Sequence, residues 1–173
     1  RDITNLLIAK APPITVNPLQ ARTLTDAVLG VEGVQFMPGV RMNTSPGYPY
    51  CSLRPGSTKG SFIREVDYEK RTFSLDPLFE EDLKLDLEKR KLGLVPPTVY
   101  ACFGKDERLK PGKNMRLIEG VSLPELVNCR MYFLDFMAAF TSANLEVGHA
   151  IGMNIFHRGA HKIVSKLHSV STH

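Results

Sequence analysis

The sequence predicts a mixed α/β (α+β) fold, and three observations lead to this prediction. A basic segment over residues 98–119 has the alternating pattern and the central Pro-Gly turn of two antiparallel strands. Two further segments, residues 77–92 and residues 124–140, have the caps and the apolar content of helices. A hydrophobic content of 43% and a charged content of 23% are ordinary for a globular protein.

The N-terminal part is predicted to hold one short helix after an irregular start. Residues 1–18 contain three prolines, which preclude a continuous helix there. Asn17 is suited to cap a helix with Pro18 at its first position, and Gly30 is suited to end it. The apolar spacing between these ends is of the three-and-four kind, so we expect a helix over residues 18–30 that faces the core.

Residues 33–50 are predicted to be a loop, because their Gly and Pro content leaves no room for a regular element. The last nine of them read MNTSPGYPY. Gly47 has no Cβ, so a backbone or a ribose-phosphate can come close to it. Thr44 and Ser45 offer hydroxyl groups to phosphate, and Tyr48 offers a ring for stacking. The alternative is a rigid, proline-rich surface turn.

A basic loop and a charged helix are expected next. Residues 54–70 mix glycines with Lys and Arg and are expected to be a mobile loop that leads into a short strand. Asp76 and Pro77 then begin a helix that Gly93 ends. Its acids gather at the N-terminal end and its bases at the C-terminal end, as the helix dipole favours. Its charged residues, Arg90 included, are expected on a solvated face of alternating charge and not at a metal site.

The basic ribbon, residues 98–119, concentrates positive charge around a turn. We expect one strand over residues 98–103 and another over residues 115–118, joined by a tight bend at Pro111 and Gly112. Twelve positions hold five cations: Lys105, Arg108, Lys110, Lys113 and Arg116. These side chains would repel one another unless a polyanion lay between them, and Lys and Arg together suit phosphate. The alternative is a solvated basic hairpin.

The C-terminal part is predicted to be helical. Ser122 and Glu125 have the spacing of a capping box, and the helix over residues 124–140 has enough apolar residues to be buried. Arg130 is the exception within it, and such an arginine is more often snorkelling or salt-bridged than part of a site.

A loop over residues 144–154 leads to a last helix over residues 156–167. His157 and His161 could share a face of that helix, but no motif supplies a third metal ligand.

Charge and cysteine content restrict the function classes. The 173 residues have a net charge of +4, which permits a polyanionic partner without demanding one. Cys51, Cys102 and Cys129 are an odd number without CxxC spacing, so we expect reduced thiols and neither a disulfide framework nor a zinc site. No apolar run approaches the roughly 20 residues that span a bilayer. The missing initial Met and the end at His173 suggest a piece of something longer.

Three of these stretches resemble, in order and spacing, the fingers region of picornavirus-like RNA-dependent RNA polymerases. They are TSPGYP at residues 44–49, KDERLKPGKNMRLI at residues 105–118, and the helix that carries Arg130. The family has a TSxGYP loop, then a KDE…K.R.I ribbon, then a helix with an inward Arg. The resemblance covers residues 22–167. This sequence has Pro46 where the family more often has Ala.

The resemblance implies an incomplete fingers subdomain of a right-hand polymerase that lacks palm and thumb. It assigns four segments: the lead-in at 1–18, the template loop at 41–50, the basic ribbon at 98–119 and, at 122–167, the helical part beside the palm. It implies template contacts by Thr44, Ser45, Gly47, Tyr48 and Pro49. It implies triphosphate contacts by Lys105 and Arg116 first, then by Lys113, Arg108 and Arg130.

The family's metal-binding aspartates do not occur in this sequence, so no catalytic or metal-ligating residue is expected in it. The complete enzyme would use Mg²⁺ or Mn²⁺, whereas the fragment would bind neither and would be inactive alone. Expected partners are an RNA template and primer, nucleoside triphosphates and the palm and thumb, within a replication complex in the host cytoplasm. The alternative is a stand-alone basic RNA-binding module without catalysis.

Overall fold

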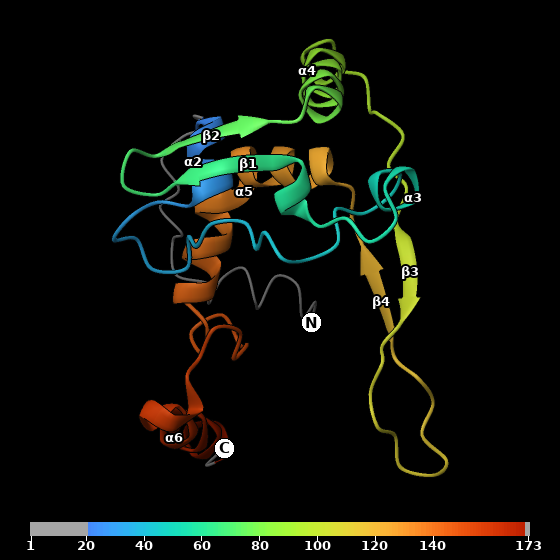
Figure 1. Ribbon diagram of the computed structural model, residues 1–173. Coiled ribbons are helices and arrows are strands. Elements are labelled where there is room, and N and C mark those ends of the chain that lie inside the picture. The colour runs from blue at the N-terminus through green and yellow to red at the C-terminus, as the bar shows by residue number, and fades with distance from the viewer. Residues whose placement is uncertain (1–20, 172–173) are drawn as a thin grey trace. The chain divides into compact units, whose positions relative to one another are not determined.

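The computed structural model describes residues 21–171, and they form helices and two small antiparallel sheets (Figure 1). The elements are α2 (Leu24–Leu29), α3 (Tyr50–Leu53), η1 (Lys59–Ser61), β1 (Ile63–Asp67), β2 (Thr72–Leu75), α4 (Pro77–Lys91), β3 (Ala101–Gly104), β4 (Leu117–Gly120), α5 (Leu123–Ser142), η2 (Ile155–Gly159) and α6 (Ala160–Ser171). The predicted α+β class is confirmed.

The described chain divides into two compact units. The larger unit contains residues 22–30 and 39–131, and the smaller unit contains residues 31–38 and the chain from Tyr132 onward. Each unit has its own apolar core. The basic ribbon and the 41–50 loop both belong to the larger unit.

The core of the larger unit joins four helices and the first hairpin. Tyr50 and Phe62 lie at its centre with ring centroids 4.9 Å apart, and Phe79 of α4 lies edge-on to Tyr50 at 6.2 Å. The other buried members are Ala27, Val28, Leu29, Ile63, Leu83, Leu123 and Val127. Helices α2, α3, α4 and α5 therefore share one core with β1.

Helix α2 is shorter than predicted. It begins at Leu24, where the Thr23 hydroxyl accepts a hydrogen bond from the amide of Asp26. Residues 21–23 are not helical, so the predicted helix over 18–30 is wrong in this part. A hydroxyl cap satisfies an amide that the helix itself cannot pair, which explains a start at this position. The Asn17 cap, Pro18 and the 1–18 lead-in lie outside the described residues.

The β1–β2 hairpin packs its turn against α2. Ile63 pairs with Leu75 and Asp67 with Thr72, with a bulge between them where Glu65 has a positive φ. Arg71 in the turn donates to the carboxylate of Asp26 at 2.8 Å and to the carbonyl of Gly30 at 2.9 Å. One guanidinium thus fastens the hairpin to α2.

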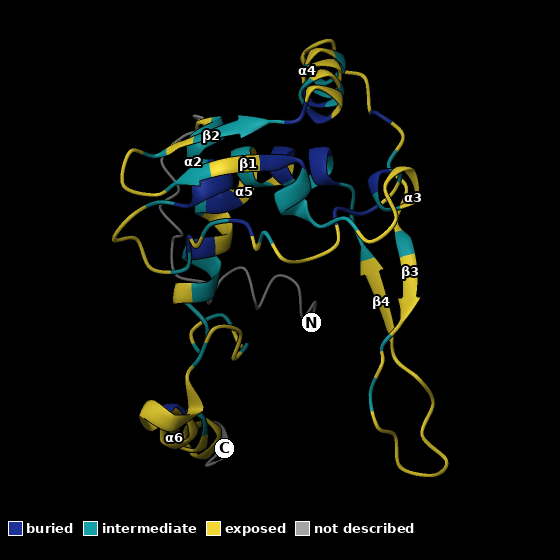
Figure 2. Cartoon of the chain, viewed as in Figure 1, coloured by how far each residue is buried: buried dark blue, intermediate teal, exposed yellow. Residues whose placement is uncertain are grey.

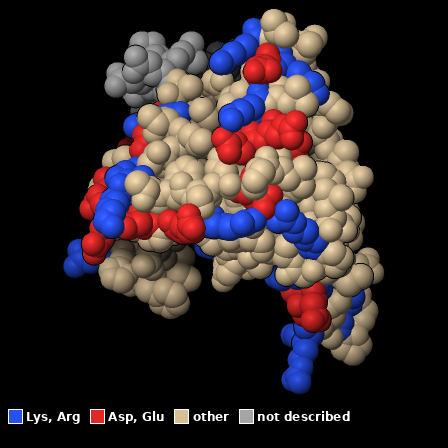
Figure 3. Space-filling model, turned by 45° about the horizontal axis from the view of Figure 1, so that its top comes forward, with Lys and Arg blue, Asp and Glu red and all other residues tan. Residues whose placement is uncertain are grey.

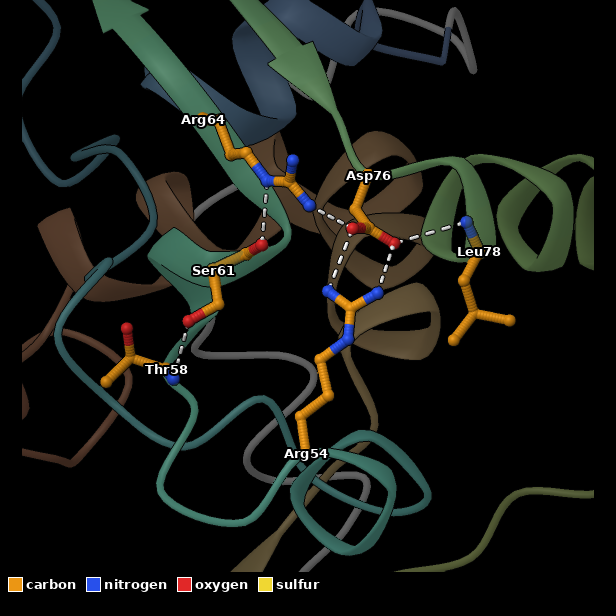
Figure 4. A network of polar contacts seen from close by, with 6 residues as sticks. All are labelled: Arg54, Thr58, Ser61, Arg64, Asp76 and Leu78. Carbon is orange, nitrogen blue, oxygen red and sulfur yellow. Dashed lines mark hydrogen bonds and ion pairs between the residues drawn. The ribbon is translucent and has the colours of Figure 1, made fainter.

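Asp76 joins three segments of the larger unit through its buried carboxylate (Figure 4). Arg54, just after α3, donates to both carboxylate oxygens at 2.8 and 3.3 Å. Arg64 of β1 forms an ion pair with the same carboxylate, which also caps α4 by accepting from the amide of Leu78 at 3.2 Å. We call these four residues the Asp76 cluster.

Helix α4 matches its prediction, since it begins at Pro77 with Asp76 as its cap and ends within one residue of Leu92. Its charged residues are less solvated than expected. Asp82 accepts a hydrogen bond from the buried Tyr50 hydroxyl, and Arg90 forms an ion pair with Glu125 of α5. The prediction of a fully solvated charged face is wrong, because these two side chains connect α4 to its neighbours.

The apolar residues of α5 are more exposed than predicted. Leu123 and Val127 lie in the core of the larger unit, and Leu134 and Ala138 lie in that of the smaller unit (Figure 2). Tyr132, Phe133, Phe136 and Met137, however, are each about half exposed. Burial of the whole helix is therefore a wrong prediction for the described residues.

The last helix begins later than predicted, at Ala160 and not at residue 156. His157 and Arg158 precede it in non-helical conformations, with φ values of −105° and 60°. His157 and His161 therefore do not share a helix face. No helix among the described residues has the length and apolar content to cross a membrane.

We expect Asp76→Ala to lower the free energy of unfolding by about 3 kcal/mol. The change removes a helix cap, worth about 1 kcal/mol, and deprives two arginines of a buried carboxylate. Urea denaturation monitored by circular dichroism measures the effect. The control Glu80→Gln breaks an exposed pair with Lys84 and should cost less than about 0.5 kcal/mol. Equal losses in the two variants would contradict a special role for Asp76.

Stability should also depend on pH through Asp76. The hydrogen bond from Arg54 holds the pKa of this carboxyl below its usual value. A depressed pKa in the folded state stabilises the fold above the unfolded-state pKa of about 3.9, and this stabilisation is lost as pH falls through the folded-state pKa. The difference in unfolding free energy between the native chain and Asp76→Asn should therefore shrink below about pH 4. A difference that stays constant from neutral pH to about pH 3 would refute this origin.

Candidate functional site

The basic ribbon is an antiparallel hairpin with a long connection. Ala101 pairs with Gly120 and Gly104 with Leu117, and the Lys105 amide donates to the Arg116 carbonyl at 2.8 Å. The predicted pairing of two strands is confirmed, although the strands begin two to three residues later than predicted. The predicted turn at Pro111-Gly112 is confirmed, since the Lys113 amide donates to the Lys110 carbonyl at 3.1 Å. It does not join the strands directly, because residues 105–116 form no strand.

Lys105, Glu107 and Arg116 form one charged cluster at the base of this connection, here called the Glu107 cluster. Arg116 donates to Glu107 from Nε at 2.6 Å and also through its Nη2, and the Lys105 ammonium lies 3.3 Å from the same carboxylate. The hydrogen bond from Arg116 holds the pKa of Glu107 below its usual value, and the pKa of Arg116 is raised in turn. The two cations predicted to act together therefore do lie together, with an ionised carboxylate between them.

This arrangement corrects the expectation that the ribbon requires an outside polyanion to hold its arms together. Glu107 supplies part of the neutralising charge from within the motif. The sequence places Glu107 two residues after Lys105, so a pairing of these two side chains could have been predicted. The approach of Arg116 to Glu107 depends on how the hairpin folds and could not. The Arg116 side chain remains 65% exposed, so the cluster is accessible to a ligand.

The remaining cations of the ribbon are not gathered in the same way. Arg108, Lys110 and Lys113 are exposed along the connection, and no ion pair joins their side chains to other described residues. On the face that Figure 3 shows, basic and acidic side chains alternate over short distances. Arg130 is half-buried on α5 and donates from Nε to the Ala27 carbonyl of α2. Burial lowers its pKa.

The 41–50 loop has a buried centre and exposed flanks. Pro46 and Gly47 are buried, whereas Thr44, Ser45 and Tyr48 are exposed and Pro49 is intermediate. Gly47 has a φ of 75°, and a Cβ added there would lie 2.2 Å from the Val121 carbonyl oxygen. The close approach that Gly47 permits is thus to the chain's own segment between β4 and α5. This contact fixes the loop and leaves its hydroxyl groups and ring at the surface.

Lys59 holds the exposed flank of this loop, and the sequence did not predict this role. Its ammonium donates to the Thr44 hydroxyl and to the Ser45 carbonyl, both at 2.6 Å. The Lys59 amide also donates to the Thr44 carbonyl at 2.9 Å. Burial lowers the pKa of Lys59. Because the partners lie about fifteen residues apart, no local pattern could have identified the pair.

Tyr48 borders a hollow of about 240 Å³ in the larger unit. Its other walls include Pro97, Val99 and the α4 residues Asp82, Asp86 and Lys89. Burial raises the pKa of Asp86, and burial together with Asp82 raises that of Tyr50 well above its usual value. Tyr50 is therefore a neutral hydroxyl donor, and it connects the end of the 41–50 loop to α4.

No group of three or more His, Cys, Asp or Glu side chains among the described residues is placed to hold a metal ion. Cys51, Cys102 and Cys129 are free thiols.

Comparison with known proteins identifies one family. A family model described as viral RNA-dependent RNA polymerase matches residues 16–173. The genome polyprotein of Ectropis obliqua picorna-like virus is 33% identical over 168 residues, which are 94% of this chain and 6% of the polyprotein. The genome polyprotein of Deformed wing virus is 29% identical over 178 residues, and the match covers 96% of this chain and 6% of that polyprotein.

A solved structure has a similar fold. The chain superposes on the Sicinivirus 3Dpol RNA-dependent RNA polymerase with a TM-score of 0.67 and 24% sequence identity. The match covers 87% of this chain and 30% of that one. The chain thus has the fold of part of a viral polymerase, and it spans a small share of the proteins it matches.

We expect Lys59→Met to loosen the 41–50 loop without unfolding the larger unit. The change removes two hydrogen bonds from a charged donor, worth about 1.5 kcal/mol together after allowance for partial exposure. The amide protons of residues 59 and 60 should then exchange with solvent about ten times faster. Hydrogen exchange measured by NMR tests this, with Lys70→Met, an exposed lysine, as the control. Unchanged protection at residue 59 would show that Lys59 does not hold the loop.

Proposed function

The chain belongs to the viral RNA-dependent RNA polymerase family, and we propose that it is the fingers region of such an enzyme. The complete protein would extend an RNA primer on an RNA template with nucleoside triphosphates and release pyrophosphate. Within it, the basic ribbon would contact the incoming triphosphate and the 41–50 loop would contact the template.

The Glu107 cluster is the observation that carries this proposal. It presents a guanidinium and an ammonium side by side at an accessible position, which suits adjacent phosphate groups. Glu107 keeps Arg116 in one orientation while no phosphate is present. A triphosphate has several negative charges against the single charge of Glu107, so it can take both cations from the carboxylate. Glu107 is therefore a positioning residue, and Lys105 and Arg116 are the contacting residues.

The chemical contribution of these cations is electrostatic. Negative charge develops on the leaving pyrophosphate during nucleotide transfer, and prearranged cations stabilise it. Arg116 can offer two parallel donors to a phosphate, which an ammonium cannot. Lys113, Arg108 and Arg130 would supply further positive charge around the triphosphate.

The 41–50 loop supports a template-binding role through what it exposes. The Ser45 hydroxyl accepts from the Gly47 amide and can donate to a phosphate oxygen, and the ring of Tyr48 can stack on a base. The Thr44 hydroxyl donates to the Arg41 carbonyl at 2.8 Å, so it would exchange that bond for one to phosphate. Gly47 and Pro49 shape the backbone that presents these groups. Lys59 beneath the flank would keep the hydroxyls in place as a strand passes.

We propose that divalent metal ions act in the complete enzyme and that this chain does not bind them. Two-metal transfer needs a pair of carboxylate-bound ions, Mg²⁺ or Mn²⁺, and the described residues offer no such group. The role that we propose for the basic ribbon is to bind and neutralise phosphate. Further partners would be the palm and thumb and the viral replication complex in the host cytoplasm.

We expect Arg116→Ala in the complete polymerase to slow nucleotide addition by about 10²- to 10³-fold, the usual cost of removing one prearranged charge-stabilising donor. Arg116→Lys should recover only part of the rate, because the second donor is missing. Folding should be unaffected, since Arg116 is exposed and contributes no core contact. Single-turnover extension of a primed RNA measures the rate.

Lys91→Ala is the control for this experiment, because Lys91 is exposed at the end of α4. Arg90 is unsuitable as a control, since its ion pair with Glu125 joins α4 to α5. If Arg116→Ala and Lys91→Ala add nucleotides at the same rate, the ribbon does not bind the triphosphate.

A further inference from the structure

The smaller unit contains a polar hollow of about 260 Å³. It lies among the end of α5, the segment around Phe36 and the turn that begins α6. Its polar lining consists of Gln35, Ser142, Asn144, Asn154, His157 and Lys162. The volume is just below the roughly 300–1,000 Å³ of pockets for small ligands, so it suits a single chemical group.

The backbone around this hollow is held in an unusual conformation. Phe36 has a φ of 66° and Arg158 a φ of 60°, in the left-handed region that residues other than glycine rarely adopt. A Cβ on Gly152 would lie 2.3 Å from Thr141 Cγ2, and one on Gly159 would lie 2.4 Å from the Asn154 carbonyl oxygen. The walls are therefore packed in one arrangement, and strained backbone of this kind is found at ligand sites more often than elsewhere.

The lining is rich in hydrogen-bond donors. The amide oxygen of Asn154 accepts from the Phe156 amide at 3.0 Å, and that of Asn144 accepts from the Leu145 amide at 2.7 Å. These bonds orient both side chains and leave their NH₂ groups to donate. Lys162 adds an ammonium that forms no ion pair with another described residue.

The charge around the hollow also favours an anionic ligand. No Asp or Glu lines it. Residues 144–169 contain Arg158, Lys162, Lys166 and four histidines against one acid, Glu146. Donors and a cation without an opposing carboxylate fit an oxyanion, and a phosphate group offers acceptor oxygens to several N–H groups at once.

We propose that this hollow binds a backbone phosphate group of an RNA strand, with Lys162 as the ion-pairing residue and the amides of Asn144 and Asn154 as donors. The choice of RNA as the source of the phosphate rests on the proposed function. The site belongs to the smaller unit, whereas the basic ribbon and the 41–50 loop belong to the larger one. It therefore adds an RNA contact that the motifs of the larger unit do not include.

The test is the binding of a fluorescently labelled oligouridylate to the 173-residue chain at several salt concentrations. Lys162→Ala should weaken binding by about 3- to 10-fold and reduce the slope of log K against log salt by about 0.7, the value for one lost contact with a single strand. Lys166→Ala is the matched control, because it removes the same charge one turn further along α6, outside the hollow. Circular dichroism checks that both variants are folded.

If the two variants weaken binding equally, or if neither does, the proposal is wrong. NMR titration of the side-chain amides of Asn144 and Asn154 distinguishes the sources of phosphate. Chemical-shift changes on addition of oligouridylate support an RNA phosphate as the ligand. Changes with inorganic phosphate but none with oligouridylate would overturn the proposal. The proposed polymerase function is tested separately, because it would fail if Arg116→Ala left the rate of nucleotide addition unchanged.

Discussion

The buried carboxylate of Asp76 is the interaction on which the larger unit depends most. It caps α4 and binds Arg54 and Arg64, so it joins a helix, a strand and the segment after α3 at one point. A buried charge is tolerated only when it is paired, so Arg54 and Arg64 must stay close to the Asp76 carboxylate in the folded state. Because Arg54 follows directly on α3, this cluster also binds the chain four residues after the 41–50 loop.

The candidate site combines a rigid support with an accessible charged group. The 41–50 loop is fixed from beneath by Gly47 against Val121, by Lys59 and by the Tyr50 hydroxyl on Asp82. The Glu107 cluster instead lies within an exposed hairpin. Exposed ion pairs contribute little to stability and can exchange partners readily. The contacts that fix the 41–50 loop are therefore stable ones, whereas the ion pairs of the Glu107 cluster can be replaced by a phosphate group.

The sequence predicted those features whose determinants lie close together along the chain. Asp76, Pro77 and Gly93 bound α4 correctly, and the alternation on each side of Pro111-Gly112 identified the paired strands. It missed contacts between distant residues, such as Lys59 with Thr44 and Arg90 with Glu125, because local patterns contain no information about them. It also missed the break before α6, where His157 and Arg158 have helical neighbours but a non-helical backbone. Propensity is a weak guide where packing decides the backbone.

The proposed role of the Glu107 cluster requires that a triphosphate replace Glu107 as the partner of Lys105 and Arg116. The most direct measurement is a crystal structure of the complete polymerase with template, primer and an incoming nucleoside triphosphate. If this role is correct, phosphate oxygens lie about 2.7–2.9 Å from the Lys105 ammonium and the Arg116 guanidinium, and Glu107 is released from at least one of them. A structure in which the triphosphate lies elsewhere while Arg116 keeps both bonds to Glu107 would contradict it.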